Sequence, residues 1–351
     1  MAQVGGFTML DDVQFIAAKD PDGALAVAAG QWDQTTYEAH VTGELPIGAP
    51  ATIVVSGMGG SALAALLAKS IFDEIMIPFE VSRGYHAPRY TGSDTLFIVS
   101  SYSGNTEETI SSFDEAIGRG ARVAVLASGG KLIERAQKAG VAYIQLPAGL
   151  QPRMAVIYNF RALTTLLVSV GILPVSRLDE LADAADFLHA ESEKWSADQP
   201  AASNEAKTLA LNALGKTPVI YGGPLAAPAA YKWKISFNEN AKNVAFWNEY
   251  SEFNHNEFIG WTSHPVEKPF AIFDLISSFE HPQIKKRFEI SDKLLSGQRP
   301  KSRVIQLKGE TILQQLLWAS ILADFVTIYV AILNGVNPVP VPLIEKLKQQ
   351  L

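Results

Sequence analysis

The stretch from Ala51 to Phe72 reads ATIVVSGMGGSALAALLAKSIF. It begins with a β-branched apolar run, continues through glycines at positions 57, 59 and 60, and ends in a segment rich in alanine and leucine. A strand, a glycine-rich loop and a helix in this order are typical of the βα unit of a parallel sheet. The stretch therefore predicts an α/β fold.

The same order of elements recurs along the chain. Further strands of the first half are predicted at residues 79–85, 94–100, 121–130 and 141–147. A second series of strands is predicted at residues 216–223, 244–250, 269–277 and 302–309. Buried strands that alternate with helices of about 10 to 15 residues predict doubly wound sheets with right-handed crossovers.

A chain of 351 residues exceeds what one hydrophobic core usually serves. We therefore expect two doubly wound subdomains, each a mostly parallel sheet flanked by helices. The expected parts are a helical N-terminal lead-in over 1–45, a first subdomain over 46–152, connecting helices over 153–214, and a second subdomain with a C-terminal tail over 215–351. Within the connecting part, residues 153–172 and 178–214 are expected to be helical throughout.

Charge and composition exclude several classes of protein. The net charge is −7 and no run of Lys or Arg offsets it, so we expect no nucleic-acid partner. The chain has no cysteine, which excludes disulfides, thiolate chemistry and cysteine-rich zinc sites. A small phosphate-bearing ligand remains possible, because backbone N–H groups can bind an anion on an acidic protein.

No segment reaches the roughly 18 uninterrupted apolar residues that a membrane span needs. Residues Leu316–Leu333 come nearest, but Asp324 lies in their middle, so a buried helix is the better interpretation. The N-terminus lacks the basic start and apolar region of a signal peptide. We therefore expect a soluble, cytoplasmic protein without membrane contact.

Two loops combine glycines with small hydroxyl side chains. They are GMGGS at 57–61 and SYSGNTEE at 101–108, and each follows a predicted strand and opens a helix. Loops of this kind meet at the carboxyl edge of a parallel sheet, where unpaired N–H groups can hold a phosphate monoester. Ser and Thr before a helix are also common N-caps, and one such loop alone would favour that alternative. The candidate phosphate ligands are Gly60, Ser61, Ser101, Ser103 and Thr106.

The second half holds a different cluster, in NENAK at 238–242 and EFNHNEF at 252–258. Glu239 and His255 are the residue types of a general acid–base pair. For His255 alone, a structural or surface histidine is the competing interpretation. A metal site built from His255 with Glu252 and Glu257 is less well supported, because no second histidine lies at helical ligand spacing.

Two cations complete the set of candidate residues. Arg153 precedes a predicted apolar helix, where a positive charge opposes the helix dipole and an anionic ligand would explain it. The alternative is an arginine that faces solvent. Lys348 lies near the C-terminus, and from the residues alone it is simply a lysine that the dipole favours at a helix end.

SSYSGNTEET at 100–109 is similar to the signature of sugar isomerase (SIS) domains, which bind phosphosugars. A wider set of segments resembles the bifunctional phosphoglucose/phosphomannose isomerase family, a branch of the phosphoglucose isomerase superfamily. These segments are SGMGGSA (56–62), LPAGLQPRMA (146–155), YKWKISFNENAK (231–242), EFNHNEFIGW (252–261), DFVTIYVA (324–331) and NPVPVPLIEKLK (337–348). The resemblance implies two SIS subdomains in each chain and a homodimer with active sites at subunit boundaries.

The resemblance also implies roles for the candidate residues. The phosphate of a hexose-6-phosphate would lie on the hydroxyls of the two loops, beside the backbone of Gly60. Glu239 matches the base that moves a proton between C1 and C2 of the open-chain sugar through a cis-enediol(ate), and Arg153 matches the arginine that stabilises this intermediate. His255, from the partner subunit, and Lys348 match the residues that assist ring opening. No metal and no other cofactor is implied.

The sequence thus predicts reversible isomerisation of glucose-6-phosphate and fructose-6-phosphate, and also of mannose-6-phosphate. One alternative is a SIS-type regulator that binds a phosphosugar without turnover. Such a regulator needs the serine loops but not Glu239, His255 and Lys348 together. A second alternative is an aminosugar-phosphate isomerase.

Overall fold

The computed structural model describes residues 3–4, 7–45, 48–263, 267, 269–348 and 350. The chain folds into two compact units. We call Gln31–Asp186 the six-stranded unit, and Met1–Gly30 with Phe187–Leu351 the four-stranded unit. The N-terminal residues thus group with the second half of the chain. The sequence motifs instead divide the chain into four consecutive parts. That division stays a prediction.

The sheet of the six-stranded unit is parallel except at one edge. Its strands follow the order β3-β8-β7-β6-β4-β5, and only β3 runs antiparallel to its neighbour, β8. The strands are β3 (Val41–Thr42), β4 (Thr52–Gly57), β5 (Phe79–Ser82), β6 (Thr95–Ser100), β7 (Arg122–Ala127) and β8 (Ala142–Gln145). The strands predicted from β-branched runs are confirmed. The short β3 was not predicted, because its residues lie within the lead-in that was expected to be helical.

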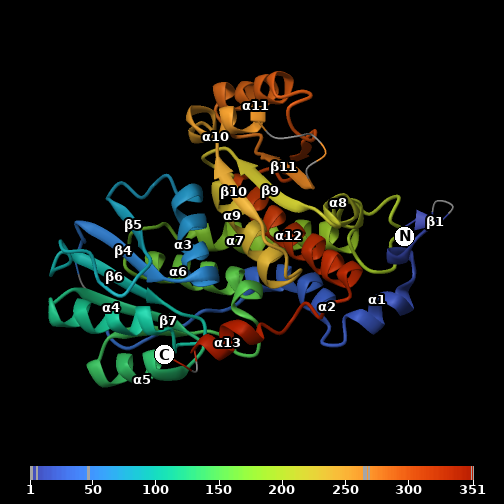
Figure 1. Ribbon diagram of the computed structural model, residues 1–351. Helices are drawn as coiled ribbons and strands as arrows, with labels where there is room; N and C mark the ends of the chain where they lie inside the picture. Colours follow the sequence, from blue (N-terminus) through green and yellow to red (C-terminus); the bar gives the residue numbers. More distant parts are fainter. Residues whose placement is uncertain are drawn as a thin grey trace. The chain divides into compact units, whose positions relative to one another are not determined.

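Helices cover both faces of this sheet. Alternate side chains such as Phe97 and Val125 pack with Phe113 of α4 (Glu107–Gly118) and Leu132 of α5 (Gly130–Ala139) on one face. Figure 1 shows α4 and α5 beside this sheet. The intervening strand residues are also fully buried, which requires cover on the opposite face. The remaining helical segments are η2 (Gln31–Thr36), α3 (Gly59–Ile71), η3 (Pro152–Met154), α6 (Val156–Ser169) and the first part of α7 (Ser176–Glu193).

The sheet of the four-stranded unit is entirely parallel, in the order β10-β9-β11-β12. Its strands are β9 (Thr217–Gly222), β10 (Phe246–Glu249), β11 (Phe270–Ile276) and β12 (Arg303–Gln306). Its longer helices are α8 (Glu205–Ala213), α9 (Ala227–Glu239), α11 (Pro282–Leu294) and α12 (Ile312–Asn334). Its shorter elements are β1 (Gln3–Val4), β2 (Phe7–Thr8), η1 (Met9–Asp11), α1 (Val13–Lys19), α2 (Ala24–Ala29), η4 (Glu252–His255), α10 (Glu257–Gly260), η5 (Trp261–Ser263) and α13 (Pro342–Lys348).

Aromatic residues fill both faces of this second sheet. Trp233 and Phe237 of α9 pack against Phe273 of β11 on one face. On the other face, Tyr221 of β9 packs with Phe253 of η4. The fold class expected from the sequence, two doubly wound sheets that are mostly parallel, is confirmed.

The observed elements differ from the expected ones in three details. The segment 178–214 is not helical throughout, because α7 ends at Glu193 and α8 begins only after Asn204, whose side chain accepts the N–H of Lys207 as an N-cap (3.0 Å). The helix α11 was not expected. The first 45 residues contain strands as well as helices, since the Gln3–Val4 strand pairs with Phe7–Thr8.

By length and composition alone, helix α12 could cross a membrane. Its side chains from Leu313 to Ile332 are almost all buried, as expected of a core helix. The expectation drawn from Asp324 is therefore confirmed: this charged residue has a partner inside the protein, Lys232.

The two sheets share one topological plan. In each, the chain passes from a central strand to one neighbour and then crosses to the other side of that central strand, so the order β5-β4-β6-β7 is repeated by β10-β9-β11-β12. The strand order therefore reverses between β4 and β6, and again between β9 and β11. Ligands of open parallel sheets bind outside the carboxyl ends of the strands at such switch points.

Candidate active site

The two hydroxyl loops meet at the switch point of the six-stranded unit. Strands β4 and β6 are parallel neighbours whose ends pair Gly57 with Ser100. Just beyond, the buried Ser61 hydroxyl accepts a hydrogen bond from the Tyr102 N–H (3.0 Å). The adjacency of the two loops, predicted from their positions after buried strands, is confirmed.

The hydroxyls of the second loop do not cap its helix. Thr106 occupies the N-cap position of α4, but its side chain makes no capping bond; its hydroxyl is hydrogen-bonded to that of Ser101 (2.8 Å). Ser101 is buried and Ser103 is exposed. The N-cap interpretation is therefore wrong for Thr106, and helix α3 likewise begins without a side-chain cap. Uncapped helix starts leave N–H groups for an anion.

Two glycines of the loops are required by close approach. A Cβ on Gly60 would lie 2.6 Å from the carbonyl oxygen of Pro152, so the start of α3 touches the segment that carries Arg153. Gly104 has a φ of +68° and a Cβ there would lie 1.7 Å from the carbonyl oxygen of Gly129. Only glycine allows the backbone to pack in this way.

Arg153 is buried in η3, and its Nη1 lies 3.4 Å from the side-chain oxygen of Gln151. The alternative of a solvent-facing arginine is wrong. Tyr102 holds the preceding segment, since its hydroxyl donates to the carbonyl of Pro147 (2.7 Å) and accepts the N–H of Leu150 (3.2 Å). The structure thus gathers a buried cation and the two hydroxyl loops around one sheet edge.

Glu239 is the last residue of α9 and is half-buried. The ammonium of Lys242 donates to the carbonyls of Glu239 (2.8 Å) and Asn240 (3.3 Å), where a cation complements the helix dipole. Lys242 has a φ of +54° and also donates to the carbonyl of Pro338 (3.0 Å). One lysine therefore joins the end of the Glu239 helix to the tail that leads to α13.

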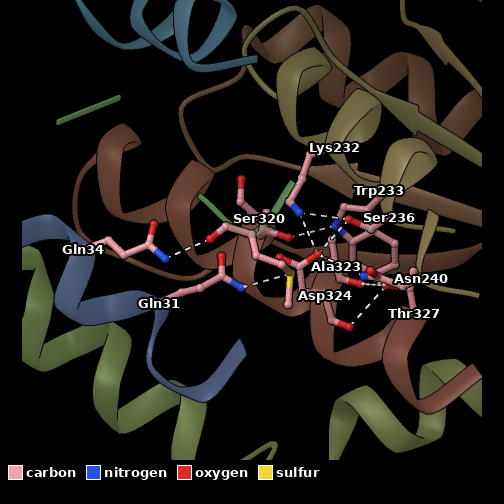
Figure 2. A network of polar contacts seen from close by, with 12 residues as sticks. Gln31, Gln34, Lys232, Trp233, Ser236, Asn240, Ser320, Ala323, Asp324 and Thr327 are labelled. Atoms are coloured by element: carbon pink, nitrogen blue, oxygen red, sulfur yellow. Dashed lines mark hydrogen bonds and ion pairs between the residues drawn. The ribbon is translucent and has the colours of Figure 1, made fainter. Parts of the chain in front are cut away.

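A buried polar network holds the same helix end from inside, as Figure 2 shows. Asp324 of α12 accepts hydrogen bonds through Oδ1 from Lys232 (2.6 Å), Ser236 (2.8 Å) and Asn240 (3.3 Å) of α9. Asn240 also donates to the hydroxyl of Thr327 (2.9 Å). Lys232 and Asp324 are fully buried, so α9 is fixed in rotation and in height along α12 at the turn next to Glu239.

His255 and Lys348 lie on the protein surface. His255 ends η4 and is exposed, and its side chain makes no hydrogen bond or ion pair to any residue that the structure describes. Lys348 is the last residue of α13, a helix with no buried side chain among those described. The possible metal site is not assembled: Glu252 bonds Asn256 and Glu257 bonds Asn248, and the described residues form no cluster of His, Asp and Glu suited to a metal.

The segment that carries His255 rests on a buried arginine. The guanidinium carbon of Arg299 lies 5.6 to 5.9 Å from the ring centres of Tyr221, Phe253 and Trp261. Nearby, burial raises the pKa of Asp274 to about 6, although the charge of Arg299 opposes this shift. Arginine over several ring faces supports the short helices that precede and follow His255.

The predicted residues fall into two groups. The phosphate candidates and Arg153 lie together in the six-stranded unit, and Glu239, His255 and Lys348 lie in the four-stranded unit. Within the second group, Lys242 links the end of the Glu239 helix to the tail before Lys348. No hydrogen bond or ion pair between described residues links the His255 side chain to either.

Comparison with known proteins identifies the family of the chain. Residues 202–351 match the model of the bacterial phospho-glucose isomerase C-terminal SIS domain. The chain is 37% identical to the bifunctional phosphoglucose/phosphomannose isomerase of Caldicellulosiruptor bescii over 85% of this chain and 89% of that protein. It is 34% identical to the protein of the same name from Aquifex aeolicus, over 85% and 90% of the two chains. The chain belongs to the bifunctional phosphoglucose/phosphomannose isomerase family.

A solved structure supports the fold. A glucose-6-phosphate isomerase like protein from Thermus thermophilus superposes with a TM-score of 0.63 at 19% identity, over 97% of this chain and 99% of that one. At this identity the likeness concerns the fold alone.

Sequence reasoning missed the residues that hold the candidate site of this family member in place. Tyr102 and Lys242 lie within the motifs SYSGNTEE and NENAK but were given no role, and Arg299 lies in no quoted motif. The roles of all three depend on contacts between distant segments. Asp324 did give a signal, because it is the only charged residue in α12. That signal argued against a membrane span but did not indicate which residue would pair with it.

Proposed function

We propose that this protein interconverts glucose-6-phosphate and fructose-6-phosphate, and mannose-6-phosphate with fructose-6-phosphate, in the cytoplasm. The observation that carries the proposal is the pair of hydrogen-bonded hydroxyl loops at the β4–β6 switch point, in a chain of this family. A sugar phosphate offers the anion that these uncapped helix starts favour.

The phosphate is proposed to lie on Ser61, Ser101, Ser103 and Thr106, beside the N–H of Gly60. Ser61 and Ser101 are already held by hydrogen bonds, so their hydroxyls need little further ordering when the ligand binds. Binding the non-reacting phosphate orients the other end of the sugar and lowers the entropic cost of the reaction.

Glu239 is proposed as the base that moves a proton between C1 and C2 of the open-chain sugar. A carboxylate that can reach both carbons removes the proton from one and returns it to the other through a cis-enediol(ate). The positive charge of Arg153 would stabilise the oxyanion that develops during this transfer. This chemistry requires no redox cofactor and no metal ion.

His255 and Lys348 are proposed to open the sugar ring by moving a proton to and from the ring oxygen. We further propose a homodimer in which His255 acts in the site of the partner subunit. The exposure of the His255 side chain, and its lack of hydrogen bonds and ion pairs to the described residues, support a role outside its own subunit.

A coupled assay that follows glucose-6-phosphate formation from fructose-6-phosphate tests the proposal. We expect turnover with fructose-6-phosphate and, in a parallel assay, with mannose-6-phosphate. Binding of fructose-6-phosphate without turnover would overturn the isomerase proposal in favour of a phosphosugar-binding regulator. A preference for glucosamine-6-phosphate would favour the aminosugar-phosphate isomerase instead.

A further inference from the structure

The switch points of the two sheets are filled differently. In the six-stranded unit, serine and threonine hydroxyls line the loops after β4 and β6. In the four-stranded unit, the equivalent loop between β9 and α9 holds the carboxylate of Glu280, which comes from the loop after β11. The repeated topology therefore places an acidic side chain where the first sheet offers its candidate phosphate site.

Glu280 makes the contacts that a bound anion would make. Its Oε1 accepts the backbone N–H groups of Leu225 (2.9 Å) and Ala226 (3.0 Å), at the start of α9. Ala226 is the N-cap residue and has no side chain that could cap the helix. A Cβ on Gly223 would lie 2.4 Å from the Cδ of Glu280, so glycine leaves the space that the carboxylate fills.

Glu280 is 3% exposed, and a carboxylate is seldom buried to this degree without strong partners. Burial and the nearby Glu249 raise its pKa, whereas the two backbone N–H bonds lower it. The N–H groups and the glycine therefore form a preformed cradle for a negative group, and a residue of the chain itself occupies it.

We propose that Glu280 is a built-in anion that closes a second phosphate-type cradle, so that each chain keeps one open site for a phosphate monoester. Only the identity of the open site rests on the proposed function; the closed cradle rests on the contacts of Glu280. When Glu280 is removed, the cradle should bind a tetrahedral oxyanion.

The test measures the melting temperature of Glu280→Ala in sulfate and in chloride at equal ionic strength. We expect Glu280→Ala to melt below wild type in chloride and to gain more from sulfate than wild type does. The gain in melting temperature of wild type in sulfate measures what sulfate binding at the open site contributes. Glu191→Ala is the matched control, because Glu191 is also buried in this unit but bonds the side chains of Lys194 and Trp318 instead of backbone N–H groups.

Glu280→Gln should show no added sulfate response, because the amide still fills the cradle. A crystal of Glu280→Ala grown in sulfate should show the ion on the N–H groups of Leu225 and Ala226. If Glu280→Ala is unfolded in chloride, its refolding yield in sulfate relative to chloride becomes the readout. A sulfate response equal to those of wild type and Glu191→Ala would overturn the proposal. The outcome does not depend on turnover, so failure of the proposed isomerase activity is recognised separately.

Discussion

At the scale of single residues, Glu239 carries the proposed proton transfer. Glu239→Gln keeps the size and polarity of the side chain but cannot accept a proton. We expect kcat to fall by about 10²- to 10⁴-fold, the usual contribution of a positioned base, while fructose-6-phosphate binding survives. The coupled assay and calorimetric titration measure the two quantities.

Glu289→Gln, on the exposed surface of α11, is the control and should leave kcat unchanged. Activity of Glu239→Gln close to that of wild type would show that another group is the base.

The buried Asp274 leads to a second prediction at this scale, about how the free energy of unfolding depends on pH. Burial raises its pKa from the ordinary 3.8 to about 6, so the native protein holds this proton to a higher pH than the unfolded chain does. Its stabilising contribution is therefore present below about pH 4 and is lost as the pH rises through about 6. The shift corresponds to about 2–3 kcal/mol of unfolding free energy.

Asp274→Asn cannot titrate, so we expect the stability of wild type relative to this variant to decline between pH 4 and pH 7. Urea unfolding at a series of pH values measures the difference. A difference that is flat over this range would mean that Asp274 titrates near its ordinary value.

At the scale of elements, the β6–α4 loop depends on a glycine at position 104. Gly104 and Gly120 have nearly equal φ angles, +68° and +71°, but only Gly104 has a neighbouring backbone atom where a Cβ would lie. We expect Gly120→Ala to cost about 1 kcal/mol for its backbone conformation. Gly104→Ala should cost roughly 3 kcal/mol, because the loop must also shift.

Chemical denaturation measures the two costs, and titration with fructose-6-phosphate should show weaker binding only for Gly104→Ala. Equal costs for the two variants would show that the loop can relax around the added methyl group.

The buried Lys232–Asp324 ion pair joins α9 to α12 and leads to a further prediction, about stability. Lys232→Met or Asp324→Leu alone leaves an unpaired buried charge and should cost about 3–5 kcal/mol. The double variant replaces both charges by apolar groups, so it should recover most of this stability. Unfolding free energies of the four proteins in a double-mutant cycle measure the coupling.

Additive costs in this cycle would contradict a coupled pair. Lys207→Met provides a comparison, since Lys207 is also buried but its ammonium donates to the backbone carbonyls of Ala197 and Gln199 (2.7 Å each).

At the scale of the whole molecule, the proposed homodimer predicts complementation between inactive variants. Glu239→Gln and His255→Ala would each be inactive alone. If His255 acts in the partner's site, a mixed dimer of the two variants has one intact site and one doubly altered site. Mixing equal amounts and allowing subunits to exchange should restore about a quarter of wild-type activity, because about half of the dimers are mixed.

Size-exclusion chromatography confirms that the mixture remains dimeric. A mixture as inactive as its components would place His255 in the site of its own subunit.

The sequence by itself determined the fold class, because buried β-branched runs alternating with helices have few other solutions. It also brought the two hydroxyl loops to one sheet edge, since parallel strands align their carboxyl ends. Only the tertiary structure decided that Thr106 pairs with Ser101, that Arg153 is buried, and that Glu280 fills the second switch point. The burial of Arg153 and the position of Glu280 depend on contacts between segments far apart in the chain, and the Thr106–Ser101 bond depends on the conformation of one loop; local propensity and periodicity encode neither.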